Sequence, residues 1–193
     1  MALTKEQMLQ AFERTEGILH GHFLLTSGRH SDTYMQCAKL FADPKESELL
    51  CADLAERLKE FKPDIVVSPA VGGIIMGYEV ARQLGVNNLF AERVDGKMTL
   101  RRGFSLKKGM RVIVVEDVVT TGGSVREVME LARGMGCEVV AVASIVDRSN
   151  GAVDFGVPYR ALLTMEVVSY EADACPLCKD GSVPYKPGSR GLK

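Results

Sequence analysis

Two acidic residues follow a run of β-branched residues in the stretch Val112-Ile-Val-Val-Glu-Asp-Val-Val-Thr-Thr-Gly-Gly-Ser124. The run predicts a buried strand, and Glu116 and Asp117 stand where that strand should end. Ionised carboxylates only accept hydrogen bonds, so they suit sugar hydroxyls or the shell of a metal ion. The pair therefore indicates a site that contacts hydroxyl groups or a cation.

The loop after the acids has the composition of a phosphate site. Gly122 and Gly123 would let a phosphate approach the backbone closely, and hydroxyl donors come from Thr120, Thr121 and Ser124. A helix should begin here, and the free N–H groups of a helix N-terminus favour an anion. The loop is not a P-loop, because no lysine follows the glycines. Phosphate on the loop and a diol on the acids predict a sugar phosphate; the alternative is a turn with two solvated acids and a helix cap.

The elements that must position this loop alternate between helix and strand. Capping residues and apolar spacing predict helices over about 4–17, 43–62, 74–84 and 125–135, and short apolar runs predict strands at 65–67, 89–91, 111–115 and 139–146. This alternation is typical of an α/β fold with a mostly parallel sheet and helices on both faces. In such a sheet ligands bind beyond the carboxyl ends of the strands, where the acids and the loop lie.

Composition limits the other possibilities. The 193 residues fit a single domain, and 24 Lys and Arg against 25 Asp and Glu give no bias toward nucleic acid or an anionic membrane. No apolar run is long enough to cross a bilayer. The amino-terminal residues read as a polar helix, and five scattered cysteines suggest a reducing compartment. We therefore expect a cytoplasmic protein whose partners include neither nucleic acid nor membrane.

The stretch 112–124 resembles the phosphoribosyl-pyrophosphate (PRPP) motif of the type I phosphoribosyltransferases. The resemblance implies that Glu116 and Asp117 hold the ribose 2- and 3-hydroxyls and that the loop holds the 5-phosphate. The expected PRPP contacts in this motif are Glu116, Asp117, Val118, Val119, Thr120, Thr121, Gly122, Gly123 and Ser124. It also implies the type I phosphoribosyltransferase fold, with a small amino-terminal hood formed by about residues 1–40 and a tail from about 180 to 193.

Further segments resemble the orotate-specific members of this family, the orotate phosphoribosyltransferases. They are 21–31 with Tyr34, Ser68-Pro-Ala-Val-Gly-Gly73, 91–103 and Val146-Asp-Arg148. The resemblance implies that Val71 and Gly72 hold the pyrophosphate. It implies that Arg148 contacts orotate, with Thr120, Thr26 and Tyr34 in the same subsite. An arginine suits the carboxylate of orotate, although an Arg at such a position is more often a surface residue, here paired with Asp147.

Residues 93–111 form a strongly basic segment, with seven Lys and Arg against one acid. Such a run is usually a solvated face or hairpin, but between two strands that end at the site it could serve as a lid over pyrophosphate. The resemblance implies that this lid closes over the active site of the neighbouring subunit, hence a homodimer. Arg93 and Lys97 are then expected to bind PRPP and, with Asp117, to be catalytic. Mg²⁺ is expected as an ion carried by PRPP, with no direct protein ligand.

Three positions depart from some members of the family. Those members have lysines where this chain has Thr26 and Gly72, and a histidine where it has Thr99. Neutralisation of pyrophosphate would then depend more on Arg93, Lys97 and magnesium. The expected activity is transfer of the phosphoribosyl group from PRPP to orotate. The alternatives are transfer to another base, or a PRPP-binding regulator without turnover.

Cys175-Pro-Leu-Cys178 has the spacing of half a zinc site, and we expect no second half in this chain. A free thiol pair is the preferred interpretation, with a metal shared across a dimer as the alternative. His20, His22 and His30 show no metal-ligand spacing with an acid and are expected to be structural or exposed. The tail after Asp180 carries no identifiable chemistry.

Overall fold

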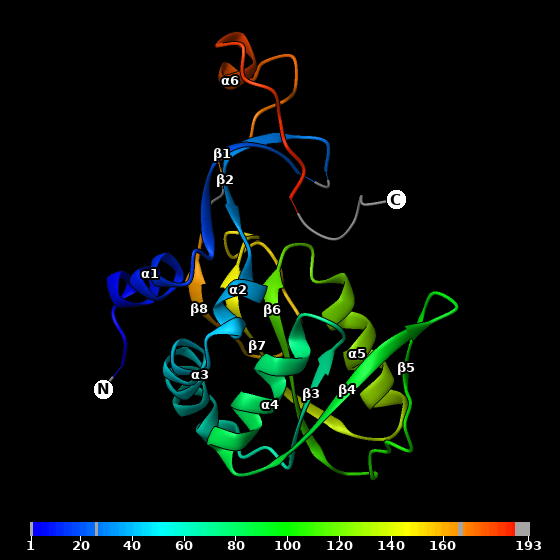
Figure 1. The fold of residues 1–193 in the computed structure, drawn as a ribbon. Helices are drawn as coiled ribbons and strands as arrows, with labels where there is room; N and C mark the ends of the chain where they lie inside the picture. Colours follow the sequence, from blue (N-terminus) through cyan, green and yellow to red (C-terminus); the bar gives the residue numbers. More distant parts are fainter. Residues whose placement is uncertain (1, 26, 166–167, 188–193) are drawn as a thin grey trace.

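A six-stranded sheet forms the body of the protein in the computed structural model, which describes residues 2–25, 27–165 and 168–187 (Figure 1). The strands lie in the order β5-β4-β3-β6-β7-β8. Their bounds are β3 Ile65–Pro69, β4 Asn87–Val94, β5 Lys97–Leu100, β6 Arg111–Val119, β7 Glu138–Asp147 and β8 Tyr159–Thr164. Neighbouring strands are parallel except β4 and β5, which form an antiparallel hairpin. The expected mostly parallel α/β sheet is confirmed.

Helices cover both faces of this sheet. They are α1 Lys5–Arg14, α2 Cys37–Ala42, α3 Pro44–Leu58, α4 Gly73–Leu84 and α5 Gly123–Gly134, with a 3-10 turn over Lys59–Phe61 and a short α6 at Pro176–Lys179. Side chains alternate along β6: Val112 and Val114 lie in the apolar cluster on the α5 side, and Ile113 and Val115 in the cluster with α1 to α4. Burying each such side chain contributes about 1.5–3 kcal/mol. Residues 112–115 are therefore apolar throughout because both of their faces are covered.

Local signals set the starts of α1 and α3 and the end of α4 where the sequence predicted them. The Thr4 hydroxyl accepts from the Gln7 N–H, and the Gln7 side chain accepts from the Thr4 N–H. The Asp43 carboxylate accepts from the first N–H groups of α3. Gly85, with φ of 71°, ends α4 in the left-handed conformation. These helices were predictable because their caps lie within a few residues of the apolar pattern.

A smaller unit, here called the hood, stands beyond the carboxyl ends of the strands (Figure 1). It contains the antiparallel strands β1 Ile18–Leu24 and β2 His30–Met35 together with residues 168–187. Isolated bridges add Tyr185 beside Phe23 and Tyr170 beside His30. Helix α1 is not part of the hood, since Met8 and Phe12 are buried in the main core. The hood is thus built from two distant parts of the chain.

Several strands were not predicted. Strand β5, the edge strand β8 and the hood strands all carry half-exposed positions instead of clean apolar runs. Strand β4 was predicted at 89–91 and is longer, Asn87–Val94. Strand β6 also runs four residues further than expected, through both acids to Val119. Among the residues that the structure describes, no helix combines the length and apolar character that a bilayer crossing requires.

Candidate active site

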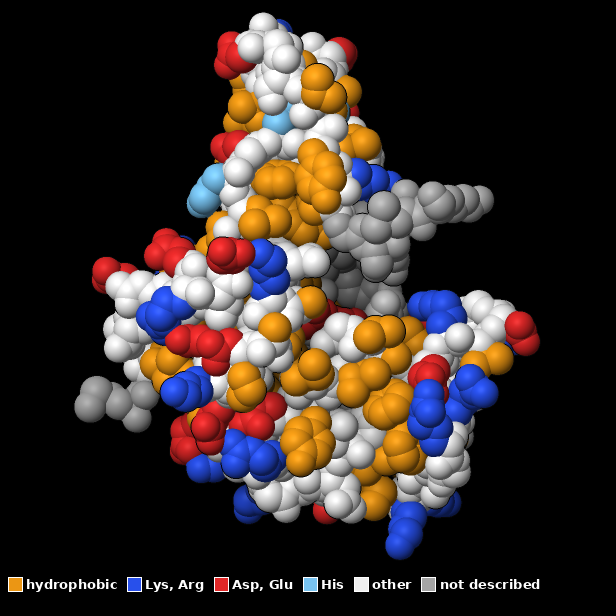
Figure 2. All heavy atoms as spheres, viewed as in Figure 1, with side chains coloured by type: hydrophobic (Ala, Val, Ile, Leu, Met, Phe, Trp, Pro, Cys, Tyr) orange, Lys and Arg blue, Asp and Glu red, His pale blue; other side chains and the backbone are white. Residues whose placement is uncertain are grey.

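A cavity of about 460 Å³ separates the hood from the carboxyl ends of the sheet strands. Figure 2 shows acidic side chains in the recess below the hood. The residues that line it come from the hood, from the loop after β3 and from the ends of β6 and β7: Leu24, Tyr34, Met35, Gln36, Cys37, Ala38, Val71, Gly72, Asp117, Val118, Thr120, Arg148, Lys186 and Pro187. The structure therefore gathers most of the expected base and pyrophosphate residues around one cavity.

Glu116 and Asp117 lie within the last residues of β6, half-buried beside each other. The Asp117 N–H donates to Glu116 Oε1 at 3.3 Å, and the Val118 N–H donates to Asp117 Oδ1 at 2.9 Å. Burial, and then the charge of Asp117, raise the pKa of Glu116 to about 9. No ion pair joins either acid to a cation in the described part of the chain. The pair is thus free to accept hydrogen bonds from a ligand.

The loop after β6 leads directly into α5 and leaves its first N–H groups without a side-chain cap. Gly122 adopts φ of 74°, and a Cβ there would lie 2.8 Å from the Phe155 ring. Both the backbone conformation and the close packing therefore require glycine. A small hollow of about 80 Å³ is lined by Glu116 and residues 118–125. Uncapped N–H groups around a small hollow suit a phosphate.

The loop after β3 touches the acid pair because Gly72 has no side chain. A Cβ on Gly72 would lie 2.7 Å from Asp117 Oδ2. The peptide bond before Val71 is cis, and Val71, which lines the cavity, is 82% exposed. A side chain at position 72 would require Asp117 to move.

Arg148 faces the cavity from the residue after β7. The pairing with Asp147 considered from the sequence is not formed: the Asp147 carboxylate accepts instead from Ser149 and Gly151. The Arg148 Nε is buried without a hydrogen-bond partner, and burial lowers the pKa of the guanidinium. A cavity-lining cation with an unused donor fits an anionic group of a ligand.

Of the other three residues expected in the base subsite, two line the cavity. Tyr34 and Thr120 line the same cavity as Arg148. Thr26 lies outside the described residues. Lys186 lines the cavity although the tail was expected to carry no chemistry. No local pattern marks Lys186, because its position depends on the tail folding back over β1.

The two expected lid residues do not reach the cavity of their own chain. Arg93, in β4, lies 2.8 Å from the Glu127 carboxylate on α5 and donates to the Gly96 carbonyl at 2.7 Å. Lys97 begins β5 and borders a separate hollow with Glu127 and Glu130. The β4–β5 hairpin extends outward from the body in Figure 1. Neither residue is among those that line the cavity.

Comparisons with known proteins identify the family of this chain. The phosphoribosyl transferase domain family matches residues 40–156. Orotate phosphoribosyltransferase of Caldanaerobacter subterraneus is 57% identical over 98% of this chain and 100% of its own, and that of Thermotoga maritima is 53% identical over 95% and 98%. The crystal structure of orotate phosphoribosyltransferase from Aeropyrum pernix superposes with a TM-score of 0.71 at 26% identity, covering 82% of this chain and 94% of that one. The chain belongs to the orotate phosphoribosyltransferase family.

Proposed function

We propose that this chain transfers the phosphoribosyl group of PRPP to orotate, giving orotidine 5-phosphate and pyrophosphate in pyrimidine (UMP) biosynthesis. The observation that carries the proposal is Arg148, a cation with an unpaired buried Nε in one cavity with Asp117 and Thr120. Orotate is a base that bears a carboxylate, and a guanidinium binds a carboxylate through two parallel hydrogen bonds. The names of the relatives at 51–57% identity support the same base.

The site would act by positioning both substrates. Glu116 and Asp117 would accept from the ribose hydroxyls, and the loop of residues 120–124 would hold the 5-phosphate. Orotate N1 is itself the nucleophile, so no covalent intermediate with the protein is needed. Holding N1 in line with the bond that breaks replaces the entropy loss of a bimolecular encounter. The nearby carboxylate of Asp117 would stabilise positive charge on the sugar as pyrophosphate leaves.

Mg²⁺ fits this site as an ion carried by PRPP. Among the described residues that line the cavity, the cations are Arg148 and Lys186, and Gly72 places no charge beside the expected pyrophosphate loop. Two cations do not balance the charge of PRPP and orotate together. Mg²⁺ takes oxygen ligands and keeps several waters, so phosphates and water can hold it without a direct protein ligand. When bound it would neutralise the departing pyrophosphate.

We further propose that the β4–β5 hairpin serves the cavity of a second subunit in a homodimer. Arg93 and Lys97 lie away from their own cavity, and the hairpin extends outward from the body (Figure 1). Arg93 is held by an exposed pair with Glu127, and such pairs contribute only about 0–1 kcal/mol. The hairpin can therefore release this contact at little cost and bring its cations to a partner's pyrophosphate.

Subunit mixing tests the shared site. Lys97→Ala and Glu116→Ala/Asp117→Ala are each expected to be inactive. In a heterodimer of the two, one cavity receives an intact lid and intact acids. Recovery should approach about a quarter of wild-type activity after exchange, because random pairing gives about half heterodimers with one good site each. No recovery after exchange verified by a tagged pull-down would show that each hairpin serves its own chain.

The choice of base is tested by pyrophosphate release from PRPP with Mg²⁺. Orotate should support release, whereas uracil, adenine and hypoxanthine should not. Faster release with a purine would assign another phosphoribosyltransferase activity. PRPP binding without release for any base would indicate a regulator instead.

We also place the reaction in the cytoplasm. All five cysteines are free thiols in the structure. Oxidising compartments favour paired cysteines, so free thiols fit a reducing one.

A further inference from the structure

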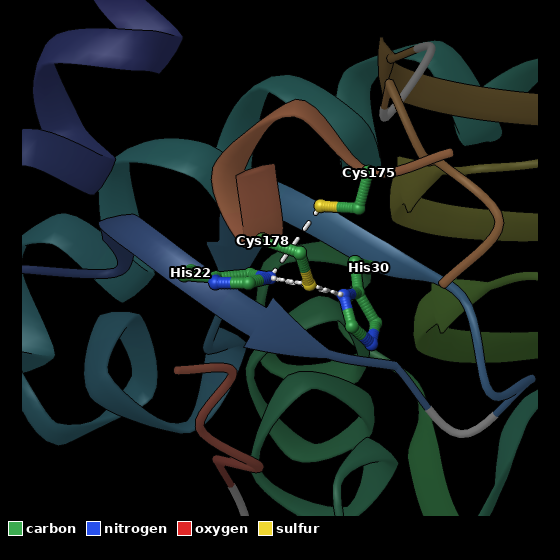
Figure 3. Close-up of side chains that lie close together, drawn as sticks. All are labelled: His22, His30, Cys175 and Cys178. Carbon is green, nitrogen blue, oxygen red and sulfur yellow. Dashed lines mark hydrogen bonds between the residues drawn. The ribbon is translucent and has the colours of Figure 1, made fainter. Parts of the chain in front are cut away.

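Four potential metal ligands converge in the hood, outside the cavity just described. Figure 3 shows His22 from β1, His30 from the start of β2, and Cys175 and Cys178 from the turn that forms α6. One ligand atom of each lies within 4.8 Å of the other three. His22, His30 and Cys175 are buried, and Cys178 is half-buried. The second half of the site that the Cys-X-X-Cys spacing lacked is thus present in the same chain.

The separations match a tetrahedral ion. With metal–sulfur and metal–nitrogen bonds of about 2.3 and 2.05 Å, tetrahedral geometry puts nitrogens about 3.3 Å apart and nitrogen and sulfur about 3.6 Å apart. His22 Nε2 lies 3.0 Å from His30 Nδ1 and 3.5 Å from Cys175 Sγ. Cys178 Sγ lies 3.8 Å from His22 Nε2 and 3.3 Å from His30 Nδ1. These four separations differ from the ideal values by a few tenths of an ångström, and all six pairwise separations lie within 4.8 Å.

The surroundings of His22 fix which of its nitrogens can bind a metal. His22 Nδ1 lies 3.1 Å from the Ser182 carbonyl oxygen and 3.0 Å from the Ser182 hydroxyl. A carbonyl oxygen only accepts, so this contact places the proton of a neutral ring on Nδ1. Nε2 then carries the lone pair, and it points at His30 and the two thiols. A histidine ligand held through its other nitrogen by a carbonyl is the usual arrangement at metal sites.

Hydrogen bonds among the four side chains, without a metal ion, explain less of this arrangement. One His30 Nδ1–H bond to His22 Nε2 would satisfy the two rings. It would not explain why two sulfurs, more than 140 residues away in sequence, also face the same point. Thiols are weak hydrogen-bond partners, whereas thiolate and imidazole together are the preferred ligands of Zn²⁺.

We propose that His22, His30, Cys175 and Cys178 bind one structural Zn²⁺ ion. All four positions of a tetrahedral ion would be filled by the protein, which is typical of structural sites and leaves no position for a substrate. None of the four residues lines the active-site cavity. The site is therefore separate from the Mg²⁺ carried by PRPP.

The ion would fasten the two distant parts of the hood to each other. The backbone links between them are the Tyr185 bonds to His22 and Leu24 and the paired bonds between His30 and Tyr170. A two-stranded hairpin is marginally stable by itself, and the hood lies outside the main helix-covered sheet. Leu24 makes one of these bonds and Lys186 directly follows Tyr185, and both residues line the cavity. Metal loss should therefore loosen the wall of the base subsite while the sheet stays folded.

The first test is metal content of the untagged chain, purified without metal-affinity resin or chelator from zinc-supplemented cells. We expect about one zinc per chain. Cys178→Ser and His22→Ala should lose most of it. Matched controls are Cys137→Ser, a cysteine of the sheet body, and His20→Ala, an exposed histidine two residues from His22 on the same strand. Both controls should keep about one zinc per chain.

A second measurement covers variants that fail to fold. Wild-type protein exchanged into Co²⁺ should show the visible absorption of a tetrahedral ion and a thiolate-to-cobalt charge-transfer band. Chelation should lower the melting temperature of wild type and of both controls but not that of Cys178→Ser. Wild-type protein that contains far less than one metal per chain and gives no cobalt spectrum would overturn the proposal. So would a Cys175–Cys178 disulfide in protein purified under reducing conditions, or full zinc content in Cys178→Ser.

Discussion

The raised pKa of Glu116 makes a prediction about stability that is independent of catalysis. The pKa lies near 9 in the folded chain, against the ordinary value of 4.5 in an unfolded one. Between these values the folded state holds a proton that the unfolded state has released. The contribution of Glu116 to the free energy of unfolding is therefore fully present below about pH 4.5. It decreases as the pH rises and is lost as the pH passes through about 9.

The magnitude follows from the same two values. Each pH unit in this window changes the free energy of unfolding by about 1.4 kcal/mol, so the loss at pH 7.5 has an upper bound of about 4 kcal/mol. Glu116 is half-buried and retains some contact with water, so roughly 1–3 kcal/mol is the expected range. Glu116→Gln removes the titration, keeps the size, and offers an N–H to Asp117. The variant should be more stable than wild type by that amount at pH 7.5 and nearly equal at pH 4.5.

Urea unfolding of both proteins at half-unit steps from pH 4.5 to 8.5 measures this difference. Glu13→Gln, at an exposed position on α1, is the matched control and should follow wild type throughout. PRPP affinity of Glu116→Gln should fall, because ribose hydroxyls that donate to position 116 favour the ionised carboxylate, which offers two acceptor oxygens where an amide offers one. A stability difference that does not grow with pH, or a less stable Gln variant at pH 8, would refute the electrostatic reasoning.

Two further substitutions examine the remaining contacts of the cavity. Arg148→Ala should weaken orotate by roughly 2–5 kcal/mol and PRPP much less, because it removes the charge partner of the carboxylate. Calorimetry with each ligand checks this, and equal weakening of both would make Arg148 a general support of the site. Gly72→Ala should weaken PRPP at least about tenfold, since its Cβ would displace the Asp117 carboxylate from a distance of 2.7 Å. The control is Gly134→Ala, which has open space around its Cβ position and should bind PRPP normally. Unchanged PRPP affinity in Gly72→Ala would show that Asp117 can move freely.

A feature could be predicted from the sequence when the residues that form it lie close together in the chain. The strand, both acids and the anion loop occupy consecutive residues from Val112 to Ser124, so their order alone predicted a sugar-phosphate site. Helices such as α3 carried their own cap at Asp43. Arg148 was placed correctly at the end of β7, although its lack of pairing with Asp147 needed coordinates.

Features built from distant residues could not be read in this way. The two halves of the histidine and cysteine cluster are separated by more than 140 residues, and nothing in either half specifies the other. Lys186 reaches the cavity only because Tyr185 pairs with β1. The position of Lys97 depends on the packing of the hairpin against α5, which a run of basic residues does not determine.

The hood joins residues that leave the ribosome at very different times. His22 contacts Ser182, 160 positions later, and at about 5–20 residues per second this interval corresponds to roughly 10–30 s. Strands β3 to β8 and their helices are all synthesised in between and can form the sheet during that time. The hood side of the cavity is therefore the last part of the molecule to assemble, and a chain still being translated should hold a finished sheet without a complete cavity. Chains stalled once β8 has cleared the exit tunnel, with residue 170 still inside it, should resist proteolysis over the sheet yet be cut within residues 18–35; equal resistance of both would show that the hood forms without its later partners.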